Sequence, residues 1–391
     1  MTGTADADGP PLPRANAELF GQEAAERVLS GVATDGRLPH AWLLTGPRGV
    51  GKATLAYRFA RFILAGGLPA SGRVAAPQAG LFGDTADEDA GVGADMTVPP
   101  DHPVFRRVAA GGHLNLLTLE PQVAEATGKR RSDIRVDEVR KAISFLRLTP
   151  ADGDWRIVIV DAADDLNANA ANALLKALEE PPRQALLLLV SHAPARLLPT
   201  IRSRCCHLAL SPLPEATVAE LLARGSPSLS GDDTAALARL ADGSIGRALE
   251  LAESGGLELY EELVGLLQGL VPATAGAEAA AARLDAGRLH ALADRVARGA
   301  DGGAFRAASE LFVWWLARMI RAGSSGHMPQ DVVPGEGELM AGLLARRSLA
   351  QWLALWDKVS RLLTRVESAN LDRKQALLAA FLELEAVTAP E

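Results

Sequence analysis

The stretch GPRGVGKAT at residues 46–54 decides the fold of this chain. An apolar run precedes it, and a helical pattern follows it at residues 55–64. A strand, a glycine loop and a helix in this order form a phosphate-binding loop, because backbone N–H groups and the helix N-terminus then face a phosphate. Gly46, Gly51 and Lys52 fit the pattern G-x-x-x-x-G-K, and the lysine would neutralise an outer phosphate. The sequence therefore predicts a P-loop framework.

Two positions that an ATP-hydrolysing site needs hold alanine instead. Ala53 stands where the P-loop pattern has a serine or threonine that holds Mg²⁺. Thr54 follows it, but one residue along a helix is a rotation of about 100°, so its hydroxyl does not simply substitute. Asp161 ends an apolar run, as a Mg²⁺-binding aspartate does, whereas Ala162 occupies the place where many such ATPases have a glutamate that polarises water. These losses argue against efficient hydrolysis and leave nucleotide binding open.

Two more carboxylates, Asp164 and Asp165, lie just beyond this strand end. One of them could act as a displaced catalytic base, or both could be solvated or capping groups. We favour the second interpretation.

The composition limits the kind of protein further. The chain has 391 residues, 48% of them hydrophobic, which is enough for two or three domains with cores of their own. Its formal net charge of −8 argues against a generally basic nucleic-acid binder. The sequence has two cysteines, Cys205 and Cys206, which excludes a disulfide framework and a four-cysteine zinc site and fits a reducing cytoplasm. No apolar run approaches the ~20 residues of a membrane span.

Apolar runs and helical patterns alternate along the first half of the chain. Short apolar runs predict buried parallel strands, and the amphipathic stretches between them predict helices. This alternation predicts an α/β fold with a doubly wound parallel sheet. Strands are expected at residues 41–45, 115–120, 156–161 and 186–190, and helices at 17–32, 55–64, 137–148 and 166–180.

The remaining segments predict a tail, an insertion and two helical regions. Residues 1–16 are interpreted as a flexible tail, and residues 66–100, rich in Gly, Ala, Pro and Asp, as a surface insertion or disordered loop. Residues 215–255 predict a small helical domain and residues 275–391 a larger one, with an internal loop at 323–337. Aromatic residues in the larger domain are expected to form its core rather than a ligand site: Phe312, Trp314, Trp315, Trp352 and Trp356.

Three stretches carry a resemblance to a known family. They are RLPHAWLLTGPRGVGK at residues 37–52, NALLKALEEPP at 172–182 and TIRSRC at 200–205. With them the chain resembles the AAA+ clamp-loader family of DNA polymerase III, of which the second stretch and the Ser-Arg-Cys tripeptide are highly specific markers. The resemblance covers residues 19–250 clearly and the C-terminal region more weakly, through Asn370-Leu371-Asp372.

The resemblance implies an AAA+ P-loop domain with a parallel sheet flanked by helices, then an all-α lid and an all-α C-terminal collar domain for oligomerisation. The implied bounds are 17–213 for the AAA+ domain, 214–265 for the lid and 270–391 for the collar. The family often has a four-cysteine zinc module where this chain has residues 66–113, which contain no cysteine. His102 and His113 alone are poor zinc ligands, so the module is either metal-free or lost, and no zinc is expected.

The resemblance also implies roles for single residues. Arg204 matches the family's arginine finger, which enters the ATP site of a neighbouring subunit; the alternative is a surface arginine that caps a helix or pairs with a carboxylate. Ser191 either matches the sensor that reads the nucleotide or is a plain strand-end serine. GSIGRAL at residues 243–249 resembles the second sensor, but Gly246 stands where active subunits have arginine, and Arg247 follows one residue late, on another face of the helix. The degenerate nucleotide site would comprise Gly46, Gly51, Lys52, Thr54, Asp161, Ser191 and Arg247.

A basic run, Lys129-Arg130-Arg131, stands in a polar stretch. It could contact DNA phosphates, as basic loops do. A short basic run in a loop is more often solvated, and we favour that interpretation.

Together with the degraded site, the resemblance implies a stator subunit of the bacterial replicative clamp loader. Such a subunit does not hydrolyse ATP, supplies an arginine finger to a neighbour and helps to load the sliding clamp on primed DNA. It would be a cytoplasmic subunit of the DNA polymerase III holoenzyme, with gamma/tau and delta-type subunits as partners. The clamp and the primer–template DNA would be reached through the complex, with no membrane contact and no required cofactor, while residual ATP binding stays open.

Two other classes of function compete with this interpretation. One is an active P-loop ATPase, such as a catalytic clamp-loader subunit or a helicase loader, which Ala53, Ala162 and Gly246 disfavour. The other is a nucleotide-independent adaptor outside replication, which the two marker stretches disfavour.

Overall fold

The computed structural model describes eight segments: residues 11–34, 38–68, 96–121, 133–148, 155–271, 283–299, 302–369 and 371–388. The chain divides into two compact units. Unit 1 comprises residues 1–225 and 242–247, and unit 2 comprises residues 226–241 and 248–391. The predicted lid, residues 214–265, is therefore divided between the two units.

Unit 1 contains a parallel sheet, which has five strands in the described segments, in the order β2-β3-β4-β1-β5. The strands are β1 (Ala41–Thr45), β2 (Leu116–Leu119), β3 (Arg156–Asp161), β4 (Ala185–Ser191) and β5 (Cys206–Ala209). Strand β1, which leads into the P-loop, lies between β4 and β5. The four expected strands are all present, which confirms the predicted α/β class. Strand β5 was not predicted.

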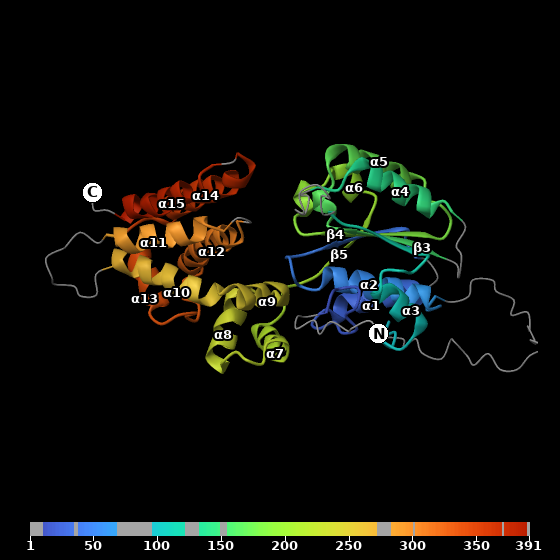
Figure 1. The fold of residues 1–391 in the computed structure, drawn as a ribbon, viewed down its shortest axis with the longest axis horizontal. Helices are drawn as coiled ribbons and strands as arrows, with labels where there is room; N and C mark the ends of the chain where they lie inside the picture. Colours follow the sequence, from blue (N-terminus) through green and yellow to red (C-terminus); the bar gives the residue numbers. More distant parts are fainter. Residues whose placement is uncertain are drawn as a thin grey trace, which may run out of the picture. The chain divides into compact units, whose positions relative to one another are not determined.

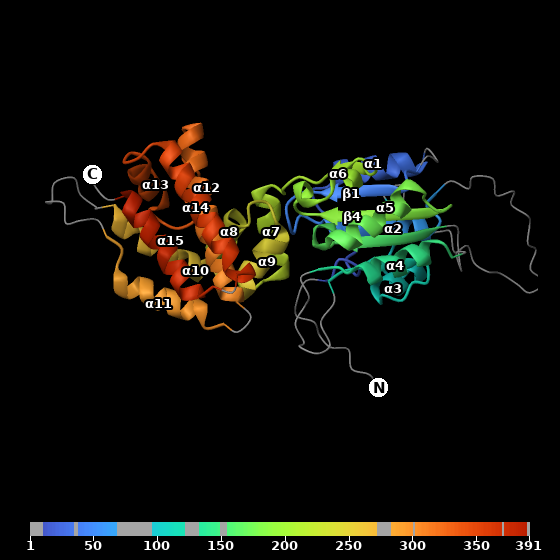
Figure 2. The same cartoon turned by 90° about the horizontal axis from the view of Figure 1, so that it is seen from above.

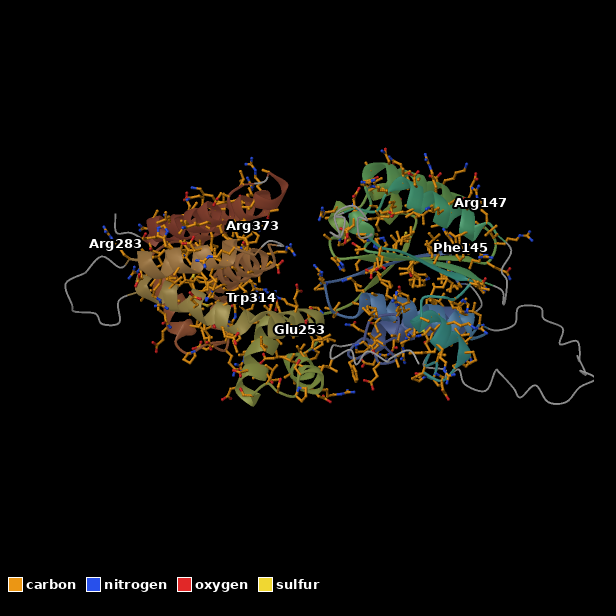
Figure 3. The ribbon with its side chains drawn as sticks, in the orientation of Figure 1. Phe145, Arg147, Glu253, Arg283, Trp314 and Arg373 are labelled. Atoms are coloured by element: carbon orange, nitrogen blue, oxygen red, sulfur yellow. The ribbon has the colours of Figure 1, made fainter. Side chains whose placement is uncertain are left out.

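Helices cover both faces of this sheet, with α1, α2 and α3 on one face and α4, α5 and α6 on the other (Figure 1). Successive residues of β3 alternate between the two cores: Ile157 and Ile159 pack with the first group, Val158 and Val160 with the second. Figure 3 shows side chains filling both spaces, and Phe145 of α4 lies under the guanidinium of Arg156, 4.7 Å from its ring centroid. The helices and 3₁₀ turns of unit 1 are α1 (Glu23–Thr34), α2 (Lys52–Leu64), α3 (Pro103–Ala109), α4 (Val136–Leu146), η1 (Ala163–Asp165), α5 (Ala168–Glu179), η2 (Pro194–Arg196), α6 (Pro199–Arg202) and α7 (Glu215–Gly225).

The first helix begins later than the predicted range 17–32. Helix α1 starts at Glu23, because the preceding Gln22 is buried and fixed by tertiary contacts. Its Nε2 donates to the carbonyl oxygens of Val50 (3.2 Å) and Ser211 (2.8 Å). The segment before Glu23 is therefore a non-helical connection held to the P-loop and to the segment after β5.

The predicted insertion, residues 66–100, is not entirely a surface segment. Met96 and Val98 are buried in the core that α1, α2 and α3 form with the sheet. Helix α3 follows them and buries Val104, Phe105 and Val108 in the same core. Met96 and Val98 are two isolated apolar residues before Pro99, so no run or periodic pattern predicts their burial. Residues 69–95 and the basic run at 129–131 lie outside the described segments.

Part of the predicted tail contacts helix α2. Arg61, which is 2% exposed, donates from Nη1 to the carbonyl of Arg14 (3.0 Å) and from Nη2 to that of Asn16 (2.7 Å). Its guanidinium also lies 4.4 Å from the ring centroid of Phe105. Burial, and secondly the charge of Arg58, lower the pKa of Arg61 to about 10. Residues 14–16 are therefore fixed by a buried cation.

Unit 2 is entirely helical in its described segments. Helices α11, α12, α14 and α15 pack side by side, as Figures 1 and 2 show. Phe312, Trp315 and Trp352 are fully buried, which confirms that they form the core, and Phe312 stacks on Phe381 with ring centroids 4.5 Å apart. Beyond α9 (Ile245–Ser254), which begins in unit 1, its elements are α8 (Gly231–Leu240), α10 (Gly256–Leu267), η3 (Gln268–Leu270), α11 (Ala286–Ala297), α12 (Gly303–Ser325), α13 (Glu336–Leu344), α14 (Leu349–Ser368) and α15 (Arg373–Thr388).

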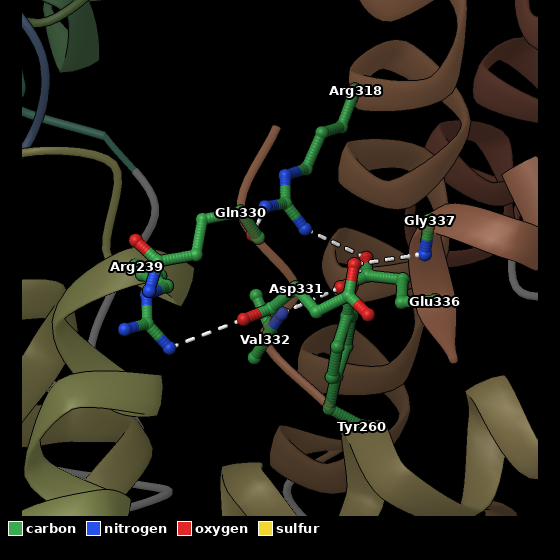
Figure 4. A network of polar contacts seen from close by, with 8 residues as sticks. All are labelled: Arg239, Tyr260, Arg318, Gln330, Asp331, Val332, Glu336 and Gly337. Carbon is green, nitrogen blue, oxygen red and sulfur yellow. Dashed lines mark hydrogen bonds and ion pairs between the residues drawn. The ribbon is translucent and has the colours of Figure 1, made fainter. Parts of the chain in front are cut away.

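The internal loop of unit 2 is shorter than predicted. Helix α12 continues to Ser325, so the loop covers residues 326–335 rather than 323–337. Polar contacts hold it to three helices (Figure 4). Arg239 of α8 donates to the carbonyl of Asp331 (3.1 Å), and the Asp331 carboxylate accepts from the backbone N–H of Gly337 in α13 (2.9 Å). Arg318 of α12 donates to the carbonyl of Gln330.

None of the helices within the described ranges combines the length and the apolar character that crossing a bilayer requires.

Candidate functional site

The order of the strands brings three predicted site segments to one edge of the sheet. Thr45, the last residue of β1 before the P-loop, is in register with Ser191 at the end of β4. Val190 of β4 is in register with Asp161 at the end of β3. The P-loop, Asp161 and Ser191 therefore meet at the carboxyl ends of adjacent parallel strands, where open α/β sheets bind ligands.

The P-loop lysine is bound to its own loop. Lys52 is 2% exposed, and its Nζ donates to the carbonyl oxygens of Gly46 (2.8 Å) and Pro47 (2.5 Å). Burial lowers the pKa of Lys52 to about 8, and the negative charges of Asp161 and Asp164 partly offset this effect. The ammonium therefore stays protonated at neutral pH, while two of its hydrogen bonds are made within the loop.

The start of helix α9 packs directly on the P-loop. The Ser244 hydroxyl donates to the carbonyl of Arg48 (2.7 Å), and the N–H of Gly246 donates to the carbonyl of Gly49 (3.1 Å). A Cβ atom at Gly246 would lie 2.9 Å from the Cα of Gly49, and a Cβ at Gly49, which has φ +77°, would lie 2.3 Å from the Ser244 hydroxyl oxygen. Larger side chains do not fit at either glycine without a shift, so the contact requires both.

This contact accommodates glycine at position 246, where the resemblance predicts arginine for an active second sensor. An arginine at position 246 would place its Cβ against the P-loop backbone. Arg247 lies in the first turn of α9, and its backbone N–H donates to the Ser244 hydroxyl (3.1 Å). Whether its guanidinium contacts a nucleotide stays a prediction.

Asp164 fixes the end of strand β4. Its Oδ1 accepts from the hydroxyl of Ser191 (2.7 Å), and its Oδ2 accepts from the N–H groups of His192 (2.5 Å) and Ala193 (3.3 Å). The capping interpretation of Asp164 is therefore confirmed. Ser191 is fully buried, and its hydroxyl proton is directed to this carboxylate.

The alanines leave the centre of the site without oxygen ligands at two positions. The side chains of Ala53 and Ala162 are methyl groups, which cannot hold Mg²⁺ or polarise water. Thr54 is 8% exposed within α2. Lys52 is thus positioned to neutralise a phosphate and Asp161 to hold a metal ion, while the side chains of Ala53 and Ala162 supply no oxygen ligand.

Arg204 lies in the turn between α6 and β5, with its side chain 36% exposed. Its Nη2 lies 2.8 Å from Oε1 of Glu179, the last residue of α5, and its Nη1 donates to the carbonyl of Thr200 (3.0 Å). The pairing with a carboxylate, which the sequence left open as an alternative to the finger, is therefore present. It does not exclude a contact with a neighbouring subunit, because the side chain is accessible.

Sequence reasoning assigned no role to two residues of this region, Glu179 and Ser244. Both stand inside stretches that were singled out, NALLKALEEPP and GSIGRAL. Their roles depend on contacts with segments distant in sequence, which a single sequence does not reveal.

The two histidines of the predicted zinc-module region have structural roles. His102 Nδ1 accepts from the N–H of Val104 (3.2 Å) and caps α3, and His113 Nδ1 accepts from that of Asn115 (3.2 Å). Among the residues with described positions, no cluster of three or more His, Cys, Asp or Glu side chains could hold a metal ion.

The fold and this site define the class of the protein. It is an α/β P-loop domain with a parallel sheet flanked by helices: the P-loop strand lies between β4 and β5, Lys52 begins α2, and Asp161 ends β3.

Comparisons with known proteins specify the relationship. The sequence profile of the family described as DNA polymerase III, delta subunit, matches residues 99–214. The chain is 38% identical over 226 residues to DNA polymerase III subunit delta′ of Pseudomonas aeruginosa, across 58% of this chain and 59% of that protein. It is 27% identical over 267 residues to subunit tau/gamma of Haemophilus influenzae, across 66% of this chain and 34% of that protein. Among solved structures, a gamma subunit-related protein of Thermotoga maritima aligns with 70% of this chain and 84% of its own length, at 22% identity and a TM-score of 0.34.

The predicted resemblance to clamp-loader subunits of DNA polymerase III, the delta′ subunit among them, is therefore confirmed. The chain spans 59% of the length of the Pseudomonas relative and about a third of the tau/gamma relative.

Proposed function

We propose that this chain is the delta-prime subunit of a bacterial replicative clamp loader. In this role it does not hydrolyse ATP, it acts as the stator of the assembly, and it supplies Arg204 as an arginine finger to the ATP site of a neighbour. Its partners are subunits of the gamma/tau and delta types within the DNA polymerase III holoenzyme. The complex acts in the cytoplasm and places the sliding clamp on primer–template DNA.

The observation that carries this proposal is the closure of the chain's own P-loop. Lys52 is bound to the carbonyls of Gly46 and Pro47, and the Ser244–Gly246 contact covers the middle of the loop. A nucleotide phosphate competes with the carbonyls of Gly46 and Pro47 for the Lys52 ammonium, and the methyl groups of Ala53 and Ala162 supply no group for hydrolysis. The chain keeps a P-loop framework that serves as a structural part.

The second support is the contrast between this closed site and Arg204. The degraded residues all serve hydrolysis in the chain's own site, whereas the Ser203-Arg204-Cys205 segment matches the family pattern in full. A finger stabilises the charge that develops on the transferring phosphoryl group, and in other P-loop systems it contributes a factor on the order of 10³–10⁵. Arg204 therefore acts on the ATP of another subunit.

The test uses the reconstituted clamp loader. Arg204→Ala should leave the fold intact, because an exposed arginine contributes little to stability, and a saturating concentration of the variant should still assemble the complex. The substitution should lower the ATP hydrolysis that DNA and clamp stimulate, and clamp loading more strongly. Arg204→Lys should restore little, because an ammonium lacks the planar fork that reaches two phosphate oxygens. Arg140→Ala is the matched control, since Arg140 is an exposed arginine of α4 that pairs with its own helix through Asp137.

Two results would contradict the proposal. One is a normally assembled Arg204→Ala complex that hydrolyses ATP and loads clamps as fast as the Arg140→Ala complex. The other is ATP turnover by the isolated chain at the rate of active loader subunits, abolished by Lys52→Ala.

A further inference from the structure

Arg204 is already bound within its own chain. Its Nη2 lies 2.8 Å from Glu179 Oε1, and its Nη1 donates to the carbonyl of Thr200 (3.0 Å) and to the hydroxyl of Ser203 (3.4 Å). These partners come from the end of α5, from α6 and from the turn that follows α6. Both terminal nitrogens of the guanidinium therefore have acceptors before another subunit is present.

The negative charge of Glu179 is unfavourable at its position in the helix. It is the last residue of α5, and the C-terminal end of a helix carries a partial negative charge. The positive charge of the Arg204 guanidinium offsets this repulsion, so the ion pair is electrostatically favourable at this helix end. The two side chains are 50% and 36% exposed, so water can exchange with either partner. An exposed ion pair of this kind shifts an equilibrium by a factor of about 1.5 to 5.

We propose that Glu179 holds Arg204 in a resting conformation in the free chain and yields it to the phosphates of a neighbouring subunit's nucleotide during assembly. This inference rests on the proposed function of Arg204 as an arginine finger. Bidentate binding of phosphate needs the planar donors of the guanidinium, and the Glu179 carboxylate occupies the donor at Nη2. A polyphosphate carries more negative charge than one carboxylate and therefore displaces it.

Glu179 and the phosphates thus compete for the same donors. Removing the carboxylate leaves the finger and its contacts with Thr200 and Ser203 in place, so the rate of the assembled site does not change. It removes the competitor, so less of the chain is needed to saturate the complex.

The experiment is a titration of this chain into its partner subunits with ATP, clamp and primed DNA, in which the rate of ATP hydrolysis is measured. At low salt, Glu179→Gln should lower the half-saturating concentration of the chain by about 2–4-fold and leave the maximal rate unchanged. The difference should vanish in about 0.5 M NaCl, because salt screens exposed charges. Glu180→Gln is the matched control. It removes the same charge from the adjacent exposed residue, whose side chain makes no ion pair or hydrogen bond with any described part of the chain.

The outcomes separate this inference from the function on which it rests. An Arg204→Ala complex with the rate of the unaltered complex overturns the arginine finger itself. A reduced rate for Arg204→Ala, together with equal half-saturating concentrations for Glu179→Gln and Glu180→Gln, overturns the resting conformation alone. A lower maximal rate for Glu179→Gln also overturns it, because the carboxylate would then assist the finger. Glu179→Ala should behave like Glu179→Gln, since both remove the charge.

Discussion

Replacing Glu336 with leucine should destabilise unit 2 by about 3–5 kcal/mol. The side chain of Glu336 is 1% exposed and accepts three hydrogen bonds (Figure 4). They come from Nη1 of Arg318 (2.7 Å), from the backbone N–H of Val332 (2.8 Å) and from the hydroxyl of Tyr260. The carboxylate thereby joins helices α10, α12 and α13 and the loop between the last two. Its loss leaves three buried donors without this acceptor.

The magnitude follows from the burial of the partners. The side chain of Arg318 is 10% exposed, and removing one member of a buried ion pair typically costs about 3–5 kcal/mol because the other charge stays buried. An unpaired buried N–H, as at Val332, contributes about 1–3 kcal/mol, which overlaps with the first figure rather than adding to it. Replacing both charges with apolar groups of similar volume is often nearly neutral. The double variant Arg318→Met with Glu336→Leu should therefore recover the part of the loss that the unpaired charge causes, while the Val332 N–H and the Tyr260 hydroxyl still lack their acceptor.

The assay is urea unfolding followed by tryptophan fluorescence. Trp314 reports on this region, because its ring lies 5.2 Å from the Arg318 guanidinium and 6.0 Å, edge to face, from Tyr260. Glu338→Leu is the control, since Glu338 is an exposed residue two positions further along the same helix. A loss for Glu336→Leu no larger than for Glu338→Leu would refute the reasoning. So would a double variant that loses the sum of the two single losses, because the charges would then be uncoupled.

Two further predictions concern the P-loop. Gly246→Ala should lower the urea midpoint of unit 1, because its Cβ would lie 2.9 Å from the Cα of Gly49. The control is Gly31→Ala in α1, where nothing lies within 4 Å of the added Cβ and the substitution should stabilise the fold by about 0.5–1 kcal/mol. A stabilising Gly246→Ala would show that the contact is loose. Because the pKa of Lys52 is lowered from 10.5 to about 8, the unfolded chain binds more protons between these pH values, so stability should rise with pH across this window. Lys52→Met should reduce that rise, and equal pH profiles for the two proteins would contradict the burial of a charged lysine.

The sequence predicted the central strands of the fold because burial on both faces imposes continuous apolar runs. β3 and β4 are buried along nearly their whole length, and both were located from composition alone. β5 was missed because three of its four residues are exposed, so Cys206–Ala209 has no such run. The start of α1 was misplaced because Gly21, which has φ +69°, and the tertiary contacts of Gln22 keep the preceding segment out of the helix.

Some residues of the candidate site could be predicted from the sequence, and some of its contacts could not. Gly46, Lys52, Asp161 and Ser191 were located from motifs, because the order of parallel strands requires these strand ends to meet. The contacts of Ser244 with the P-loop and of Glu179 with Arg204 could not be predicted, because they join segments 196 and 25 residues apart. The first holds the P-loop to the start of α9, and the second pairs Arg204 within its own chain, so both proposals rest on contacts that the sequence did not reveal.

The presence of Lys52 in a site that lacks the other groups for hydrolysis has a structural explanation. Its ammonium is buried and bridges the carbonyls of Gly46 and Pro47, which otherwise have to find other donors as the loop turns. Gly46 is half-buried and Pro47 is exposed, so these two hydrogen bonds replace bonds to water and fix the turn of the loop whether or not a nucleotide binds. The side chains that Ala53 and Ala162 replace have no such structural role, since the hydroxyl would hold Mg²⁺ and the carboxylate would polarise the attacking water. A P-loop lysine in such a chain is therefore evidence for the fold of the loop, and the residues around it decide whether the loop hydrolyses ATP.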